Sequence, residues 1–80
     1  MLELRPNCEC CDQNLPPDST DAFICTFECT FCRACATDAL QGICPNCSGN
    51  LLQRPVRPAA KLAQYPASQQ RVFKPHGCAP

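Results

Sequence analysis

The sequence predicts a small α+β domain that depends on its cysteines for stability and is followed by a basic tail. Ten of its 80 residues are cysteines, and eight of these form four closely spaced pairs. Short runs of aromatic and β-branched residues indicate a β-hairpin, and a run of good helix formers indicates one short helix. A chain of this length buries too little surface to be stable without a further constraint, so we expect the cysteines to supply it.

The first half of the chain contains a cysteine knuckle and the predicted hairpin. Residues 8–11 (Cys-Glu-Cys-Cys) form a tight knuckle with one additional thiol. Residues 15–21 are rich in proline, aspartate and serine, which predicts an exposed loop. Residues 22–25 and 29–31 are β-favouring runs, and we expect them to pair as a short hairpin.

Residues 33–41 predict the helix. They are good helix formers with apolar spacing, and Gly42 is placed to end the helix as its C′ residue. A helix of about two to three turns does not persist alone in water. We therefore expect Cys32 and Cys35, at its start, to be tied to the rest of the domain.

A second knuckle and a tail complete the chain. Residues 44–47 (Cys-Pro-Asn-Cys) form the knuckle, and residues 51–54 could add a last strand. Beyond them, prolines punctuate alanine, glutamine and basic residues, and at most a turn or two of helix is supported at residues 58–64. We therefore divide the chain into a domain at residues 1–54 and a Pro-rich basic tail at residues 55–80.

Charge is segregated along the chain, although the formal net charge is zero. All seven acids precede position 39, whereas five of the seven bases follow position 50: Arg54, Arg57, Lys61, Arg71 and Lys74. These cations could bind nucleic acid or lie against the acidic half, and with few aromatic residues they make a weak nucleic-acid signature. We expect residues 51–65 to pack on the domain through the apolar anchors Leu52, Val56 and Leu62, with residues after 66 looser.

The N-terminal residues show no basic region followed by a long apolar run, and the sequence has no apolar run long enough for a membrane span. We therefore expect a cytoplasmic protein with no membrane contact. In a reducing compartment, cysteines at this density favour metal thiolates over disulfides.

Four cysteine pairs can hold two zinc ions, because each ion takes four thiolates in a tetrahedral site. In a sequential scheme the first two pairs share one ion; in a cross-braced scheme the first pair joins the third and the second joins the fourth. The predicted helix favours the cross-braced scheme, since a knuckle and a helix start are the two halves of a treble-clef site. The expected ligands are Cys8, Cys11, Cys32 and Cys35 for one ion, and Cys25, Cys29, Cys44 and Cys47 for the other.

Three further residues of ligand type have no place among these eight. We interpret Cys10 and Cys78 as spare thiols. A Cys-x-Cys arrangement can also bind one metal, so Cys10 could replace Cys8 or Cys11. His76 with Cys78 could cap a site as His-x-Cys.

The spacing of the eight cysteines over residues 8–47, with its Cys-Pro-x-Cys last knuckle, resembles the RING finger consensus in an all-cysteine version. This resemblance implies a RING-like, treble-clef cross-brace with two structural zinc ions. The full chain, including residues 54–60, also resembles a family of short bacterial cysteine-rich proteins of unknown function. That second resemblance implies a bacterial cytoplasmic zinc protein and adds no activity.

The chain departs from the RING pattern where ubiquitin ligases bind their conjugating enzyme. Those ligases use an apolar residue in the first knuckle, an aromatic residue between the sixth and seventh ligands, and often an arginine after the eighth. Here the corresponding positions hold Glu9 or Cys10, no aromatic residue between Cys35 and Cys44, and Ser48. We therefore expect the ligase surface to be missing.

Catalysis finds little support in the sequence. Zinc held by four thiolates is closed to substrate, the single histidine lies outside the cysteine pattern, and the glycines form no phosphate-binding loop. We expect a non-catalytic, zinc-stabilised module that binds a protein, or a nucleic acid through the basic tail. The alternatives are a metallothionein-like metal buffer and a RING-like ligase-type adaptor; two ions per chain would favour the module and more than two the buffer.

Overall fold

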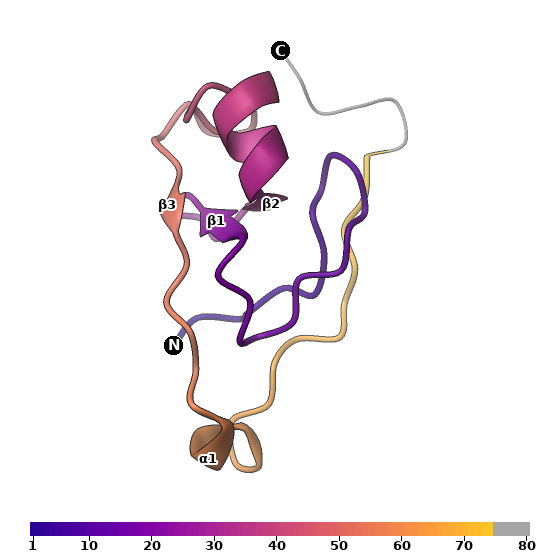
Figure 1. Ribbon diagram of the computed structural model, residues 1–80, viewed down its shortest axis with the longest axis vertical. Helices are drawn as coiled ribbons and strands as arrows, with labels where there is room; N and C mark the ends of the chain where they lie inside the picture. Colours follow the sequence, from indigo (N-terminus) through magenta and orange to yellow (C-terminus); the bar gives the residue numbers. More distant parts are fainter. Residues whose placement is uncertain (75–80) are drawn as a thin grey trace.

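The computed structural model describes residues 1–74. Its elements follow one another as β1 (Ala22–Ile24), β2 (Thr30–Cys32), η1 (Cys35–Ala39), β3 (Leu52–Gln53) and α1 (Ala59–Leu62). The strands form one sheet in the order β2-β1-β3, the η1 segment lies next to this sheet, and α1 lies at the far end of the molecule (Figure 1). The predicted α+β class is therefore confirmed in this coarse form.

The sheet is antiparallel and confirms the predicted hairpin. Phe23 pairs with Phe31 and Ile24 pairs with Thr30 across β1 and β2, while Ile24 also pairs with Leu52 of β3. The chain reverses just beyond Ile24, where Glu28 has a positive φ of 63° and its N–H donates to the carbonyl of residue 25 at 3.1 Å. Because β2 begins directly after Cys29, the hairpin positions this predicted ligand.

The predicted helix is present, but η1 winds as a π-helix. The N–H of Leu40 donates to the carbonyl of Cys35 at 2.9 Å, five residues back. Gly42 ends the segment as predicted: its φ is +79°, and its N–H donates to the carbonyl of Ala36 at 2.7 Å. Single π-helical turns are rare and occur mostly at functional sites, and this one begins at a predicted metal ligand.

A small core lies between the sheet, η1 and the loop at residues 15–21. Its apolar members other than cysteines are Leu15, Ala22, Phe31, Ala36, Leu40 and Leu51. The expectation that the whole loop is exposed is wrong for its first residue, because Leu15 is only 1% exposed. The Leu15 N–H donates to the carbonyl of Pro6 at 2.8 Å, so the lead-in segment holds this side chain against the core.

The apolar anchors predicted for residues 51–65 are wrong. Leu52 is 65% exposed, Val56 is 45% exposed, and Leu62 is only partly buried. Two arginines hold the segment instead, because their guanidinium groups donate to backbone carbonyls. Arg54 is buried, and Arg57 donates to the carbonyl of residue 2 and to that of residue 65, both at 2.7 Å.

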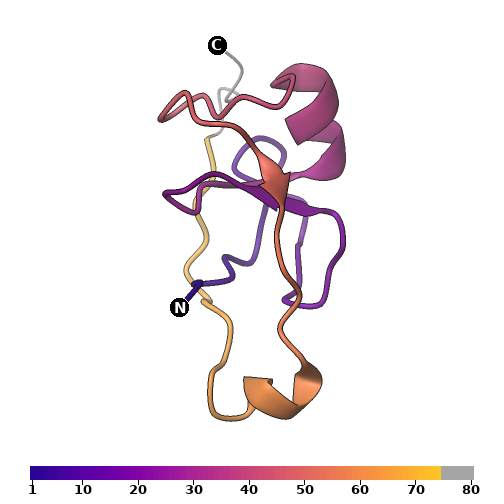
Figure 2. The same cartoon turned by 90° about the vertical axis from the view of Figure 1, so that its left-hand side faces the viewer.

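Residues 66–74, here called the C-terminal strap, run back along the N-terminal segment (Figure 2). The N–H of Ser68 donates to the carbonyl of Glu3 at 2.8 Å, and Asn7 exchanges two hydrogen bonds with the backbone of Val72. The expectation of looser packing after residue 66 is therefore wrong for the described part of the tail. In the part of the chain that the structure describes, no helix is long and apolar enough to cross a membrane.

Candidate metal centres

The first cysteine group joins the first knuckle to the start of the helical segment. The sulfur atoms of Cys8, Cys11, Cys32 and Cys35 all lie within 4.8 Å of one another, and Cys11 Sγ lies 3.7 Å from Cys32 Sγ. Four sulfur ligands about 2.3 Å from one tetrahedral ion lie about 3.8 Å apart, so this spacing suits a metal held by four thiolates. The four residues expected to share an ion are thus brought together.

The second group joins the hairpin turn to the second knuckle. The sulfur atoms of Cys25, Cys44 and Cys47 lie within 4.8 Å of one another. Cys29, the fourth residue expected here, is buried but does not lie within this distance of all three. Its thiol does interact with those of Cys25 and Cys44, so it lies at the border of the group.

The two groups interleave along the chain. The first and third cysteine pairs meet in one group, and the second and fourth pairs supply the other. A sequential arrangement would instead have placed neighbouring pairs together. Seven of the eight expected residues are therefore grouped as the cross-braced scheme requires, and either group could bind a metal ion.

Both knuckles have the same backbone geometry. In each, the N–H of the first cysteine donates to a carbonyl five residues on, its own carbonyl accepts from an N–H four residues on, and the residue after the second cysteine has a positive φ. In the first knuckle, the N–H of Cys8 donates to Gln13 O at 2.9 Å, the N–H of Asp12 donates to Cys8 O at 2.9 Å, and the φ of Asp12 is 63°. In the second knuckle, the N–H of Cys44 donates to Gly49 O at 2.7 Å, the N–H of Ser48 donates to Cys44 O at 2.9 Å, and the φ of Ser48 is 67°. The Cys-x2-Cys spacing thus folds into one repeated turn.

Backbone N–H groups point at the sulfur atoms of both groups. Cys8 Sγ accepts from the N–H of Cys10 at 3.4 Å, Cys32 Sγ from that of Cys35 at 3.5 Å, and Cys47 Sγ from that of Gly49 at 3.4 Å. At Gly49 a Cβ atom would lie only 3.3 Å from Cys47 Sγ, so the absence of a side chain allows this approach. Such donors favour the thiolate form that metals bind.

The thiols of each group differ in pKa. Burial raises the pKa of the Cys44 thiol to about 12 and also raises that of Cys35, and neighbouring thiols add to both shifts. Burial also opposes ionisation of Cys8 and Cys25, but hydrogen bonds from backbone N–H groups outweigh it and lower their pKa. Each group therefore combines a thiol that ionises readily with one that holds its proton.

Cys10 belongs to neither group. It is partly buried and disulfide-bonded, so its interpretation as a spare thiol is wrong. Its backbone N–H donates to Cys8 Sγ, and the grouped residues of that knuckle are Cys8 and Cys11. His76 and Cys78 lie outside the described residues.

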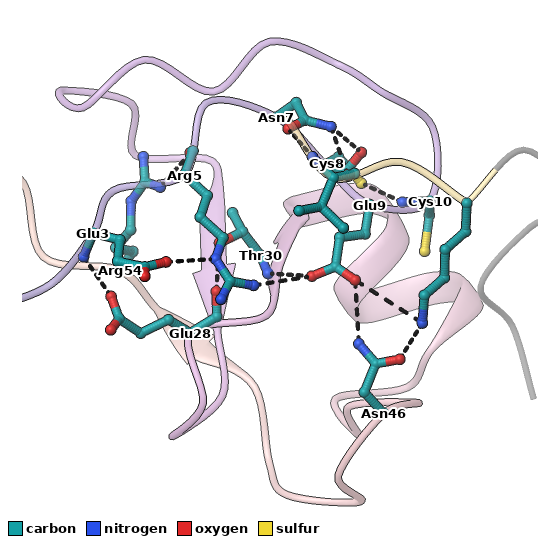
Figure 3. A network of polar contacts seen from close by, with 12 residues as sticks. Glu3, Arg5, Asn7, Cys8, Glu9, Cys10, Glu28, Thr30, Asn46 and Arg54 are labelled. Atoms are coloured by element: carbon teal, nitrogen blue, oxygen red, sulfur yellow. Dashed lines mark hydrogen bonds and ion pairs between the residues drawn. The ribbon is translucent and has the colours of Figure 1, made fainter. Parts of the chain in front are cut away.

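Glu9 is a buried acid in the first knuckle whose polar contacts are drawn in Figure 3, and sequence reasoning gave it no such role. Its side chain contacts Arg5, Thr30, Asn46 and Lys74, which come from four different parts of the chain. A glutamate in a knuckle usually faces solvent, and the sequence carries no signal that distinguishes this one. Only the folded arrangement of these distant residues reveals it.

The chain is similar to known bacterial proteins over its whole length. It is 70% identical over 80 residues to an uncharacterized protein of Rhizobium meliloti (strain 1021), covering 100% of this chain and 95% of the relative. No solved structure matches it. A family model described as a protein of unknown function (DUF1272) matches residues 1–57, which contain both cysteine groups. The chain therefore belongs to the DUF1272 family.

Proposed function

We propose that each cysteine group binds one Zn²⁺ ion and that the protein is a non-catalytic module that binds a protein partner. The observation that carries this proposal is the interleaving of two sulfur groups drawn from four chain segments. Two ions placed there would tie together the N-terminal segment, the hairpin, η1 and the second knuckle. Zinc held by four thiolates is closed to substrate and stabilises a fold, which is why the proposed role is binding rather than catalysis.

Cys29 is the proposed fourth ligand of the second ion. Its thiol already interacts with those of Cys25 and Cys44, and structural zinc is almost always four-coordinate. A small movement of the hairpin turn would bring its sulfur to the ion. With this ligand the module is a RING-like, treble-clef cross-brace.

Two alternative functions are less well supported. A metallothionein-like buffer needs no packed core, whereas here the sulfur groups adjoin a cluster that includes Leu15, Phe31 and Leu40. A ubiquitin-ligase-type adaptor needs an exposed apolar residue in the first knuckle. Glu9 occupies that knuckle and is buried in polar contacts.

A protein is the proposed partner because most of the tail cations are engaged within the molecule. Arg54 and Arg57 donate to backbone carbonyls, Arg71 lies 2.8 Å from Asp12, and Lys74 contacts Asn46 and Glu9. The spare positive charge for a nucleic acid is correspondingly small, and sustained nucleic-acid binding requires many phosphate contacts. The eight cysteines of the predicted ligand set are free thiols, which supports the cytoplasm as the proposed location.

Chelation tests whether the ions are structural. Apparent zinc binding in small domains contributes about 10–16 kcal/mol, whereas a whole domain is stable by only about 5–15 kcal/mol. We expect a zinc chelator to unfold the protein, seen as loss of dispersed amide signals in the NMR spectrum, and added zinc to restore them. Cys44→Ser should unfold in the same way. A spectrum that survives complete zinc removal would contradict the proposal.

A further inference from the structure

The carboxylate of Glu9 has polar contacts with residues that neighbour cysteines of both groups. Glu9 follows Cys8 in the first knuckle, and the residue is only 2% exposed. A buried carboxylate loses its hydration and is stable only when hydrogen bonds or charges compensate. The contacts that compensate it here come from Arg5, Thr30, Asn46 and Lys74 (Figure 3).

On one side Glu9 holds β2. Its backbone N–H donates to the carbonyl of Thr30 at 3.0 Å, and its Oε2 accepts from the Thr30 N–H at 3.2 Å. This strand carries Cys32 of the first group, and Cys29, the proposed fourth ligand of the second ion, immediately precedes it. Arg5 Nη1 lies 3.6 Å from the same carboxylate oxygen and offsets part of its charge.

On the other side Glu9 holds the second knuckle. Its Oε1 accepts a hydrogen bond from Asn46 Nδ2 at 3.2 Å, and Asn46 lies between Cys44 and Cys47. The Asn46 side chain also interacts with the Cys29 thiol. Lys74 of the C-terminal strap donates to Asn46 Oδ1 and has its Nζ 4.0 Å from Glu9 Oε1.

We propose that Glu9 is a positioning residue that couples the loading of the two metal centres, so that an ion in one group favours binding in the other. This inference rests on the proposed binding of two ions. A metal in the first group orders the first knuckle and with it the Glu9 carboxylate. The ordered carboxylate then fixes Asn46 and Thr30, which lowers the entropy that the second group must lose when it binds. By linkage the effect is equal in both directions.

The coupling depends on the two acceptor oxygens of a carboxylate. One oxygen serves the Thr30 N–H and the other serves Asn46 Nδ2, whereas a carboxamide has one acceptor oxygen and one NH₂ donor. In Glu9→Gln, the NH₂ group of the glutamine therefore faces either the Thr30 N–H or Asn46 Nδ2, both of which are donors. Rotation of the Asn46 amide would satisfy the glutamine but turn Nδ2 toward the Lys74 ammonium. The substitution keeps the size of the side chain but removes one of the two hydrogen bonds that join residue 9 to Thr30 and Asn46.

Partial loading with zinc measures the coupling in the intact chain. Metal-free protein is given one Zn²⁺ per chain, and native mass spectrometry counts chains with none, one or two ions. Two equal, independent sites leave about half of the chains with a single ion, and a coupling of about tenfold reduces this share to about a quarter. We expect the single-ion share to be low in the wild type and to rise in Glu9→Gln.

Two further variants make the result decisive. Glu3→Gln makes the same chemical change at an exposed acid that pairs with Arg5, so its distribution should match the wild type. Asn46→Ala removes the contact of Glu9 to the second knuckle, together with the contacts of the Asn46 amide to Lys74 and to the Cys29 thiol, so it should raise the single-ion share even if Glu9→Gln fails to load zinc.

The outcomes also separate this inference from the proposed function. A substitution that weakens both sites equally leaves the distribution unchanged under tight binding, so a structural role of Glu9 that affects both sites alike gives the wild-type pattern. An unchanged single-ion share in Asn46→Ala and in any Glu9→Gln that loads zinc, or a share of about half in the wild type, would overturn the coupling. A wild-type chain that takes up only one ion in excess zinc would instead refute the proposed function.

Discussion

Replacing Arg54 by methionine should destabilise the protein more than any change at an exposed arginine. The side chain is 2% exposed, and its guanidinium donates to three backbone carbonyls rather than to a carboxylate. Nη1 donates to the carbonyl of Arg5 at 2.9 Å, and Nη2 donates to those of Leu15 at 3.3 Å and Pro16 at 3.1 Å. Arg54 thereby joins the strand after the second knuckle to the lead-in segment and the 15–21 loop.

The size of the effect follows from what methionine leaves behind. A buried carbonyl without a donor costs about 1–3 kcal/mol, and a hydrogen bond to a charged group contributes about 1.5–3 kcal/mol. Three such bonds are lost here, one of them to the buried carbonyl of Leu15. Methionine recovers part of this, because an uncharged side chain avoids the desolvation penalty of the guanidinium. That penalty is visible in Arg54, since burial lowers its pKa and, among the described residues, Nε has no hydrogen-bond partner. We expect a net loss of about 2–4 kcal/mol.

Urea unfolding at a fixed free-zinc concentration, followed by circular dichroism, measures this loss. Arg33→Met is the matched control, because Arg33 is exposed, lies 3.2 Å from Asp21 and stacks on Phe23 at 5.2 Å. Its effect should stay within about 1 kcal/mol. If Arg54→Met unfolds at the same urea concentration as the control, the buried guanidinium does not hold these segments and the reasoning is wrong.

Three further predictions concern the tail, the thiols and the ligase resemblance. Truncation after Arg54 removes the hydrogen bonds of Arg57 and of the C-terminal strap and should lower the unfolding free energy by roughly 2–4 kcal/mol. Unchanged stability together with loss of salt-sensitive nucleic-acid binding would instead indicate that the tail reaches outward to a nucleic acid. Burial raises the pKa of the Cys44 thiol to about 12, and zinc must displace such protons, so the metal-bound state carries fewer protons than the metal-free state. Competition with a chelator should therefore show that the zinc affinity falls about tenfold or more for each pH unit toward acid. The protein should not discharge ubiquitin from a charged conjugating enzyme, because Glu9 is buried and Ser48 is polar; robust discharge would contradict this.

Local patterns in the sequence were sufficient to predict the hairpin, the helical segment and the grouping of the cysteines. Residues 22–25 and 29–31 contain aromatic and β-branched side chains, and β1 and β2 form there. The helix position favoured one of two pairing schemes, and the observed groups follow that scheme. These features depend on near neighbours and on spacing, which a single sequence records.

The features that the sequence did not predict depend on distant partners. Charge alone groups Arg54 with the cations after position 50, yet its acceptors come from residues 5, 15 and 16. Leu52 looks like an apolar anchor, but β3 is the last strand of the sheet and this side chain faces solvent. The bridging position of Glu9 likewise requires Thr30 and Asn46 to be near one another. Spacing carries no information about such contacts.

The intact mass of the full chain under native conditions tests the central claim most directly. Protein purified from cells grown with ample zinc is measured before and after acidification in the spectrometer solvent, so that the mass difference counts the ions lost. The two interleaved sulfur groups predict a difference of two zinc ions per chain. A chain that carries one ion or none in excess zinc, or more than two, would contradict the account.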